Sequence, residues 1–144
     1  MSTLKVDTYL TRGGASEIAI DKLKGVTAAG SMLVVGEGGT TTTNLQQGLA
    51  KAWCHFEGSD ATVDDSLNVT NLTDNGTGNF DVNYTNNMSN ANFAPSTTAN
   101  ISITGATYCK CQTYTTASVR LHQISNGGHA DCNDTVSTTH GDLA

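Results

Sequence analysis

The sequence has little charge and few of the residues that build a hydrophobic core. Of its 144 residues, 14% are charged, 6% are aromatic and one is proline, while Leu, Ile, Val and Phe together number 27. So few core formers are typical of disordered chains only when the net charge is extreme, and here it is a moderate −6. Because little apolar surface opposes the entropy cost of folding, we expect the chain to gain stability from subunit partners.

Other features that the sequence lacks exclude whole classes of protein. No run of about 18 apolar residues is present to cross a membrane as a helix, and the residues after Met1 lack the apolar stretch of a secretory signal. With a net charge of −6, the chain is poorly suited to nucleic acid, which binds clustered Lys and Arg. Four cysteines without a secretory signal indicate reduced thiols.

Charge divides the chain near Lys51. Residues 1–51 carry five basic and four acidic residues, whereas residues 52–144 carry two basic and nine acidic residues. The low-complexity residues 38–43 lie beside this boundary and are typical of a linker. We therefore divide the chain into an amino-terminal arm, residues 1–50, which serves as attachment segment and linker, and a head domain, residues 51–144.

The arm contains only short apolar segments. Residues 32–35 form one such run, and residues 16–21 alternate like a half-buried strand, although residues 18–26 also fit helical turns. Residues 44–51 are the best helix candidate, with Asn44 as the N-cap. None of these segments builds a core, so we expect the arm to be extended, with at most short helical turns, and to pack against a partner.

From residue 52 onward, apolar residues alternate with polar ones, as in strands that bury one face. Residues 80–84 show the cleanest alternation, and the same pattern through residues 67–70 predicts another strand. Asn-Gly pairs at residues 75–76 and 126–127 predict tight turns, and Pro95 favours an edge strand. Short strands at this spacing predict an all-β fold, namely a short antiparallel β-sandwich or small barrel.

Cys109 and Cys111 are the strongest candidates for metal chemistry. In a strand these two thiols point to one face and can reach one ion. The other ligands would come from the remaining thiols and two imidazoles: Cys54, Cys132, His55 or His129. Structural zinc sites usually leave at least about two residues between paired cysteines, and the same alternation suits small apolar residues facing a core. We therefore predict buried thiols, with a disulfide or a metal ion as alternatives.

No other motif points to an enzyme or a cofactor. The glycine-rich residues 36–40 lack the Lys of a phosphate loop, and no Gly-x-Ser-x-Gly motif is present. The acidic residues at 64–65 and 131–134 do not have the spacing of a calcium loop. We therefore predict no enzyme activity and no cofactor.

Three segments resemble a domain of bacteriophage tail-fibre and other virion-fibre proteins. They are residues 51–58 (KAWCHFEG), residues 68–78 with Thr-Asp-Asn-Gly-Thr-Gly, and the alternating residues 80–84. Residues 2–8 resemble the leader that often precedes this domain, whereas Cys54 and His55 depart from its pattern. The resemblance implies a homotrimeric virion appendage, fixed to other virion proteins by its arm and contacting a host surface glycan or protein through its β-structured head.

We therefore expect a non-enzymatic tail-fibre protein located in the virion, without nucleic acid and without insertion in a membrane. A capsid decoration or head-fibre protein is the alternative, and a small metal- or thiol-dependent enzyme is a second one. Asn-rich loops suit recognition by adaptable hydrogen bonds, so we expect the head loops to form one exposed rim. The receptor-contact candidates are Asn75, Asn87, Asn90, Asn126 and His129, and the assembly candidates are Leu4, Val6, Leu33, Val34 and Val35.

Overall fold

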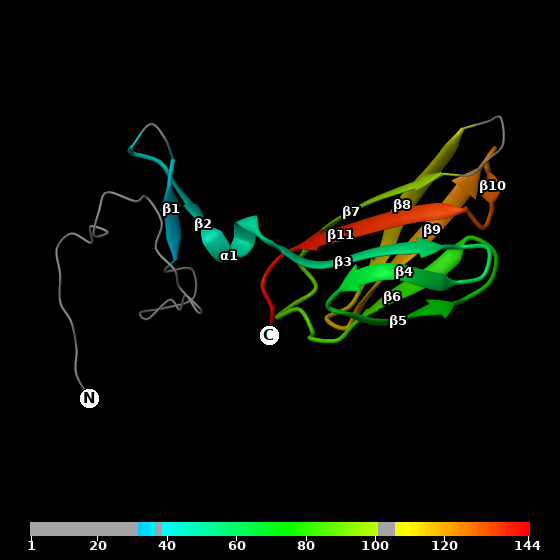
Figure 1. Cartoon of the computed structure of the whole chain (residues 1–144), viewed down its shortest axis with the longest axis horizontal. Coiled ribbons are helices and arrows are strands. Elements are labelled where there is room, and N and C mark those ends of the chain that lie inside the picture. The colour runs from blue at the N-terminus through cyan, green and yellow to red at the C-terminus, as the bar shows by residue number, and fades with distance from the viewer. Residues whose placement is uncertain (1–31, 37–38, 101–105) are drawn as a thin grey trace, which may run out of the picture.

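A computed structural model describes residues 32–36, 39–100 and 106–144. The assembly candidates Leu4 and Val6, and the segment predicted at residues 16–26, lie outside the described residues. Within them, antiparallel sheets make up nearly all of the regular structure (Figure 1). The predicted all-β fold is confirmed, and it is a small sandwich.

Two antiparallel sheets form the sandwich. The first has the order β4 (Thr62–Leu67), β3 (Ala50–Glu57), β11 (Asp134–His140) and β7 (Ala94–Asn100). The second has the order β5 (Val69–Asp74), β6 (Asn79–Tyr84), β9 (Ser118–Ser125) and β8 (Thr107–Tyr114), with the short β10 (Gly128–His129) also paired to β9. Pro95 lies in β7, which is an edge strand among the described strands, as its missing N–H predicted.

The chain crosses from the first sheet to the second at Asn68. The sequence predicted one strand through residues 67–70, but β4 ends at Leu67 and β5 begins at Val69 in the other sheet. Asn68 has a left-handed φ of 57°, which Asn tolerates better than most residues. Its side-chain oxygen accepts a hydrogen bond of 2.7 Å from the backbone N–H of Asn86. The single strand was therefore a wrong prediction, because alternation of side chains does not report a kink at one residue.

The core lies between the two sheets and is built from alternate residues of their central strands. Phe56 on β3 and Phe80 on β6 are both fully buried, with ring centroids 5.4 Å apart. The alternation predicted for residues 80–84 is confirmed by their burial pattern. The buried hydrophobic residues are Ala52, Cys54, Phe56, Phe80, Val82, Tyr84, Met88, Val119, Leu121, Ile124 and Cys132.

Hydrogen-bonded polar side chains fill part of the interior. Gln123 is completely buried, and its amide nitrogen donates to the hydroxyl of Thr135 at 2.8 Å. Its amide oxygen accepts from the backbone N–H of Cys132 at 2.7 Å. Buried polar groups lower stability unless they are paired in this way. Such pairing explains how an ordered sandwich forms from a sequence with few core residues.

The described part of the arm consists of three short elements. They are β1 (Leu33–Val35), β2 (Thr42–Asn44) and α1 (Leu45–Gly48), with β1 and β2 paired antiparallel. The predicted N-cap is confirmed, because the side-chain oxygen of Asn44 accepts a hydrogen bond of 3.0 Å from the N–H of Gln47. The helix is shorter than the predicted residues 44–51, because β3 already begins at Ala50. The helix α1 buries no residue. One turn without a buried face adds little stability of its own.

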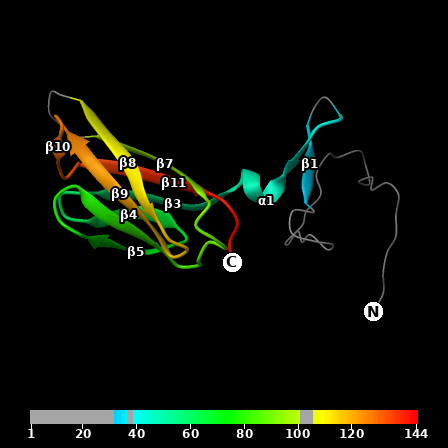
Figure 2. The same cartoon turned by 180° about the vertical axis from the view of Figure 1, so that it is seen from behind.

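The strands place the connecting loops at two opposite ends of the sandwich. The proximal end, where β3 starts beside α1, also holds the C-terminus, at the left of the sandwich in Figure 1. We name the opposite end the distal end, and Figure 2 shows both ends from behind. From β3 to β10, successive strands reverse direction, so the β5–β6 and β9–β10 turns are distal and the β6–β7 connection is proximal.

Candidate functional site

The receptor-contact candidates lie at opposite ends of the sandwich. Three of them are in distal turns and two are in the proximal β6–β7 connection: Asn75, Asn126 and His129 are distal, and Asn87 and Asn90 are proximal. The proximal connection is bound to the C-terminal segment, where the N–H of Ala144 donates to the carbonyl of Asn87 at 2.9 Å. The single rim predicted from sequence does not form, because an odd number of strands separates these loops.

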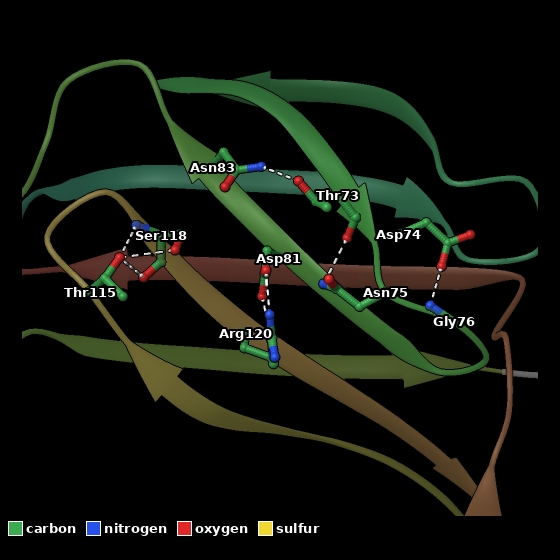
Figure 3. Close-up of polar contacts among 9 residues, drawn as sticks. All are labelled: Thr73, Asp74, Asn75, Gly76, Asp81, Asn83, Thr115, Ser118 and Arg120. Carbon is green, nitrogen blue, oxygen red and sulfur yellow. Dashed lines mark hydrogen bonds and ion pairs between the residues drawn. The ribbon is translucent and has the colours of Figure 1, made fainter.

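Asn75 lies in the β5–β6 turn, whose shape depends on two glycines. Gly76 and Gly78 have φ angles of 104° and 65°, in the region that favours glycine. The carboxylate of Asp74 accepts a hydrogen bond of 2.8 Å from the N–H of Gly76 (Figure 3). The N–H of Gln123 on β9 donates to the carbonyl of Gly78 at 2.8 Å. The predicted turn is confirmed, and a backbone hydrogen bond connects it to β9.

A network of polar side chains covers the outer face of β5, β6 and β9 (Figure 3). Arg120 donates from Nε and Nη2 to the two carboxylate oxygens of Asp81, at 2.6 and 2.7 Å. These hydrogen bonds hold the pKa of Asp81 below its usual value. The amide of Asn83 donates to the side-chain oxygens of Asn71 and Thr73, both at 2.9 Å. These hydrogen bonds connect β9 to β6 and β6 to β5 on the outer face.

Four further side chains, which we name the distal patch, lie beside this network. They are Tyr108 and Lys110 on β8, His122 on β9 and His129 on β10. Lys110 and His122 are directly paired in the β8–β9 register, and the rings of His122 and His129 are 5.0 Å apart at 69°. Partial burial, followed by the positive charge of neighbours that include Lys110, lowers the pKa of His122. The patch therefore joins an exposed cation, two imidazoles and a phenol.

Sequence reasoning found only His129 of this patch. Tyr108 and Lys110 are separated by one residue on a strand, which showed that they share a face but not which residues lie opposite them. The pairing of Lys110 with His122 depends on the β8–β9 register, and that register shifts at a bulge between Cys111 and Thr113. The spacing of residues 108–110 was the only signal that the sequence offered.

On the outer face of the other sheet, His55 lies among carboxylates. Its Nε2 is 2.5 Å from the carboxylate of Asp134 on β11, and its Nδ1 is 3.8 Å from that of Asp64 on β4. The hydrogen bond to Asp134 is the main cause that raises the pKa of His55, and the charges of Asp64 and Asp65 add to it. In the part of the chain that the structure describes, no three His, Cys, Asp or Glu residues are arranged to hold a metal ion.

All four cysteines are free thiols that face the interior or lie within it. Cys54 and Cys132 are buried, whereas Cys109 and Cys111 are partly buried and point inward from β8. Desolvation is the main cause that raises the pKa values of Cys54 and Cys109 to about 11. The alternation that predicted inward-facing thiols at Cys109 and Cys111 is confirmed, and His55 points away from them on an outer face.

The described assembly candidates are three neighbouring apolar side chains on the arm. Leu33, Val34 and Val35 are 55%, 50% and 59% exposed. They form strand β1, whose partner among the described strands is β2 alone. An isolated pair of strands is marginally stable in water at best. Among the described residues, the hairpin therefore exposes apolar side chains and a strand edge that no other described strand pairs with.

Comparison with known proteins found no protein-family model, no curated protein and no solved structure that matches this chain. Among the described residues, no helix has both the length and the apolar character needed to span a membrane.

Proposed function

We propose that this chain is a structural virion protein of a bacteriophage, a homotrimeric tail-fibre component without enzyme activity. Its arm attaches to other virion proteins, and its head contacts the host surface. The chain then acts by assembly and recognition.

The exposed β1 strand is the observation that carries this proposal. Leu33, Val34 and Val35 are each at least half exposed on a strand whose second edge is unpaired among the described strands, and such an edge is a template for another chain. The hairpin adjoins the proximal end, opposite the distal loops (Figure 1). Exposed apolar side chains at one end suit attachment to other proteins, and polar loops at the opposite end suit recognition.

The motifs that resemble virion-fibre proteins support the proposal from the head. Residues 51–58 form most of β3, and residues 68–78 run through β5 to its turn with β6. The resemblance therefore covers neighbouring parts of one sandwich rather than scattered surface segments. Asn75 follows β5 in the turn to β6, which lies at the end of the sandwich remote from the arm.

Sedimentation equilibrium of the full chain tests the assembly part. We expect the mass of a trimer at micromolar concentration, and we expect Val34→Asp to weaken assembly because a charge would be buried at the interface. Lys51→Gln, which changes a charge outside the hairpin, serves as the control. A monomeric wild-type chain would contradict the proposal.

Immunogold labelling of phage particles tests the location. Label on tail fibres supports the proposal, and label on capsid capsomers would instead establish the alternative, a capsid decoration or head-fibre protein. Particles without label would contradict both.

A further inference from the structure

The distal patch holds one of the few cations of an acidic protein. Only three Lys or Arg residues are found among the described residues: Lys51, Lys110 and Arg120. Lys110 and Arg120 lie on the outer face of the same sheet, together with His122 and His129. Residues 52–144 carry nine acidic residues against these two cations, so a free positive charge on the head is uncommon.

Lys110 is the cation of this face that is available to a ligand. Arg120 is already neutralised by two hydrogen bonds to Asp81, at 2.6 and 2.7 Å. Lys110 is exposed and makes no ion pair within the described residues. Its register partner is His122, whose ring lies 5.0 Å from that of His129.

Tyr108 adds an aromatic surface to the same patch. It is 51% exposed and lies two residues before Lys110, hence on the same face of β8. Its register partner on β9 is Ile124, which is buried. Residues paired in this way have neighbouring side chains on the same face of the sheet. An exposed aromatic ring with a polar tip offers a large contact area at low entropic cost.

These features together define the chemistry of a ligand. A single unpaired lysine suits a monoanion such as a sugar carboxylate, whereas a phosphate monoester carries about two negative charges. One lysine is also too few for a nucleic acid, whose affinity grows with the number of phosphates neutralised. The apolar face of a sugar ring fits an exposed aromatic side chain, and its hydroxyl groups fit imidazoles as hydrogen-bond partners.

We infer that the distal patch binds an acidic saccharide, with the sugar carboxylate at Lys110, its ring against Tyr108 and its hydroxyl groups at His122 and His129. This inference rests on the proposed function, and it names the class of host-surface ligand that the head recognises. The patch lies on the part of β8, β9 and β10 that is remote from the arm (Figure 2).

Isothermal titration of the full chain with defined oligosaccharides tests this inference. The acidic probes are sialyllactose and trigalacturonate, and their neutral counterparts are lactose and the methyl ester of trigalacturonate. We expect at least one acidic probe to bind about fivefold or more tightly than its neutral counterpart, the effect of one favourable charge contact. Equal binding of both members in each pair would overturn the inference, as would no binding of any acidic probe up to about 10 mM.

Variants then locate the site. Lys110→Gln is expected to weaken binding of the acidic probe about threefold to fivefold, and Tyr108→Ala by a similar factor. Lys51→Gln is the matched control, because it removes the same charge at the proximal end, and its affinity should stay within about twofold of the wild type. An equal loss in Lys51→Gln and Lys110→Gln would place the effect in net charge and overturn the inference.

Failure of this inference can be told apart from failure of the proposed function. If the protein is found on tail fibres and Lys110→Gln binds acidic probes as well as the wild type, the fibre function stands and the distal patch is not its glycan site. If the protein is absent from particles, the fibre function fails, although the titration still measures the ligand of the patch.

Discussion

Gly78 lies so close to Gln123 that any side chain at position 78 would clash with the backbone of β9. A Cβ built on Gly78 would be 2.5 Å from the carbonyl oxygen of Gln123 and 2.8 Å from the backbone nitrogen of Ala130. Both neighbours are backbone atoms, which cannot move aside as a flexible side chain can. The β5–β6 turn therefore packs against β9, which carries His122, at a position that only glycine fits.

We expect Gly78→Ala to destabilise the head by about 2 to 4 kcal/mol, because it combines a positive φ with a backbone clash. Gly76→Ala is the matched control: its φ of 104° is also unfavourable, but nothing lies within 4 Å of its Cβ. Gly76→Ala should lower the free energy of unfolding by about 1 to 2 kcal/mol, from backbone strain alone. Urea unfolding measures both, and an equal loss in the two variants would show that the close approach to Gln123 is unimportant.

The sequence predicted those parts of the fold that depend on neighbouring residues. The Asn-Gly turn at residues 75–76 and the alternation at residues 80–84 are local signals, and both are confirmed. The crossing at Asn68 was missed, because Leu67 and Val69 keep the alternation of one strand while the backbone turns between them. Strand patterns report which side chains are buried, but not in which sheet they are buried.

The candidate site was harder to predict than the fold. Asn87 and Asn90 resemble the other loop residues in chemistry, yet strand direction puts the β6–β7 connection that holds them at the proximal end. Lys110 and His122 belong together only because of a register between strands. Such pairings are long-range in sequence, and composition carries no information about them.

The ion pair of His55 with Asp134 predicts a pH-dependent contribution to stability. Since the hydrogen bond to Asp134 raises the pKa of His55 above 6.5, the folded state holds this proton more tightly than the unfolded state. The contribution is complete below the unfolded pKa and is lost as the pH rises through the folded pKa. Asp134→Asn should return the pKa of His55 towards 6.5, as measured by an NMR titration of its ring protons.

Asp142→Asn is the control for that titration, since it removes a carboxylate at the proximal end. The pKa of His55 should stay raised in this variant. If Asp134→Asn leaves the pKa of His55 unchanged, the pairing across β3 and β11 does not govern it.

The thiols should react slowly in the folded protein. The pKa values of Cys54 and Cys109 are raised to about 11, chiefly by desolvation, so little thiolate is present at neutral pH. We expect iodoacetamide to label these two residues much more slowly in buffer than in urea, where all four cysteines become accessible. Peptide mass spectrometry measures the label at each cysteine, and rapid native labelling of Cys54 or Cys109 would contradict their burial.

The same raised pKa values predict lower stability in alkaline solution. The folded state keeps the thiol protons of Cys54 and Cys109 over a range of pH in which the unfolded chain has lost them. Their contribution is complete below the unfolded pKa of about 8.5 and is lost as the pH rises towards 11. Cys109→Ser should lessen this alkaline loss in a series of urea unfolding curves, because a serine hydroxyl does not ionise in that range.

The pair formed by Asp81 and Arg120 predicts the opposite dependence on pH. Hydrogen bonds from Arg120 lower the pKa of Asp81 below 3.8, so the folded state holds this proton less tightly than the unfolded state. The stabilisation is present above the unfolded pKa and is lost as the pH falls through the folded pKa. Arg120→Gln should lower the thermal unfolding midpoint at pH near 7, and the difference from the wild type should shrink in acid.

Carboxyl NMR of Asp81 provides the direct measurement, because its pKa should rise in Arg120→Gln. Lys110→Gln is the matched control on the same face, since Lys110 makes no ion pair within the described residues. It should leave both the pKa of Asp81 and the unfolding midpoint nearly unchanged. If the two variants shift the pKa of Asp81 equally, the total positive charge of this face sets that pKa, rather than the two hydrogen bonds from Arg120. Arg120 would then also be available to an anionic ligand.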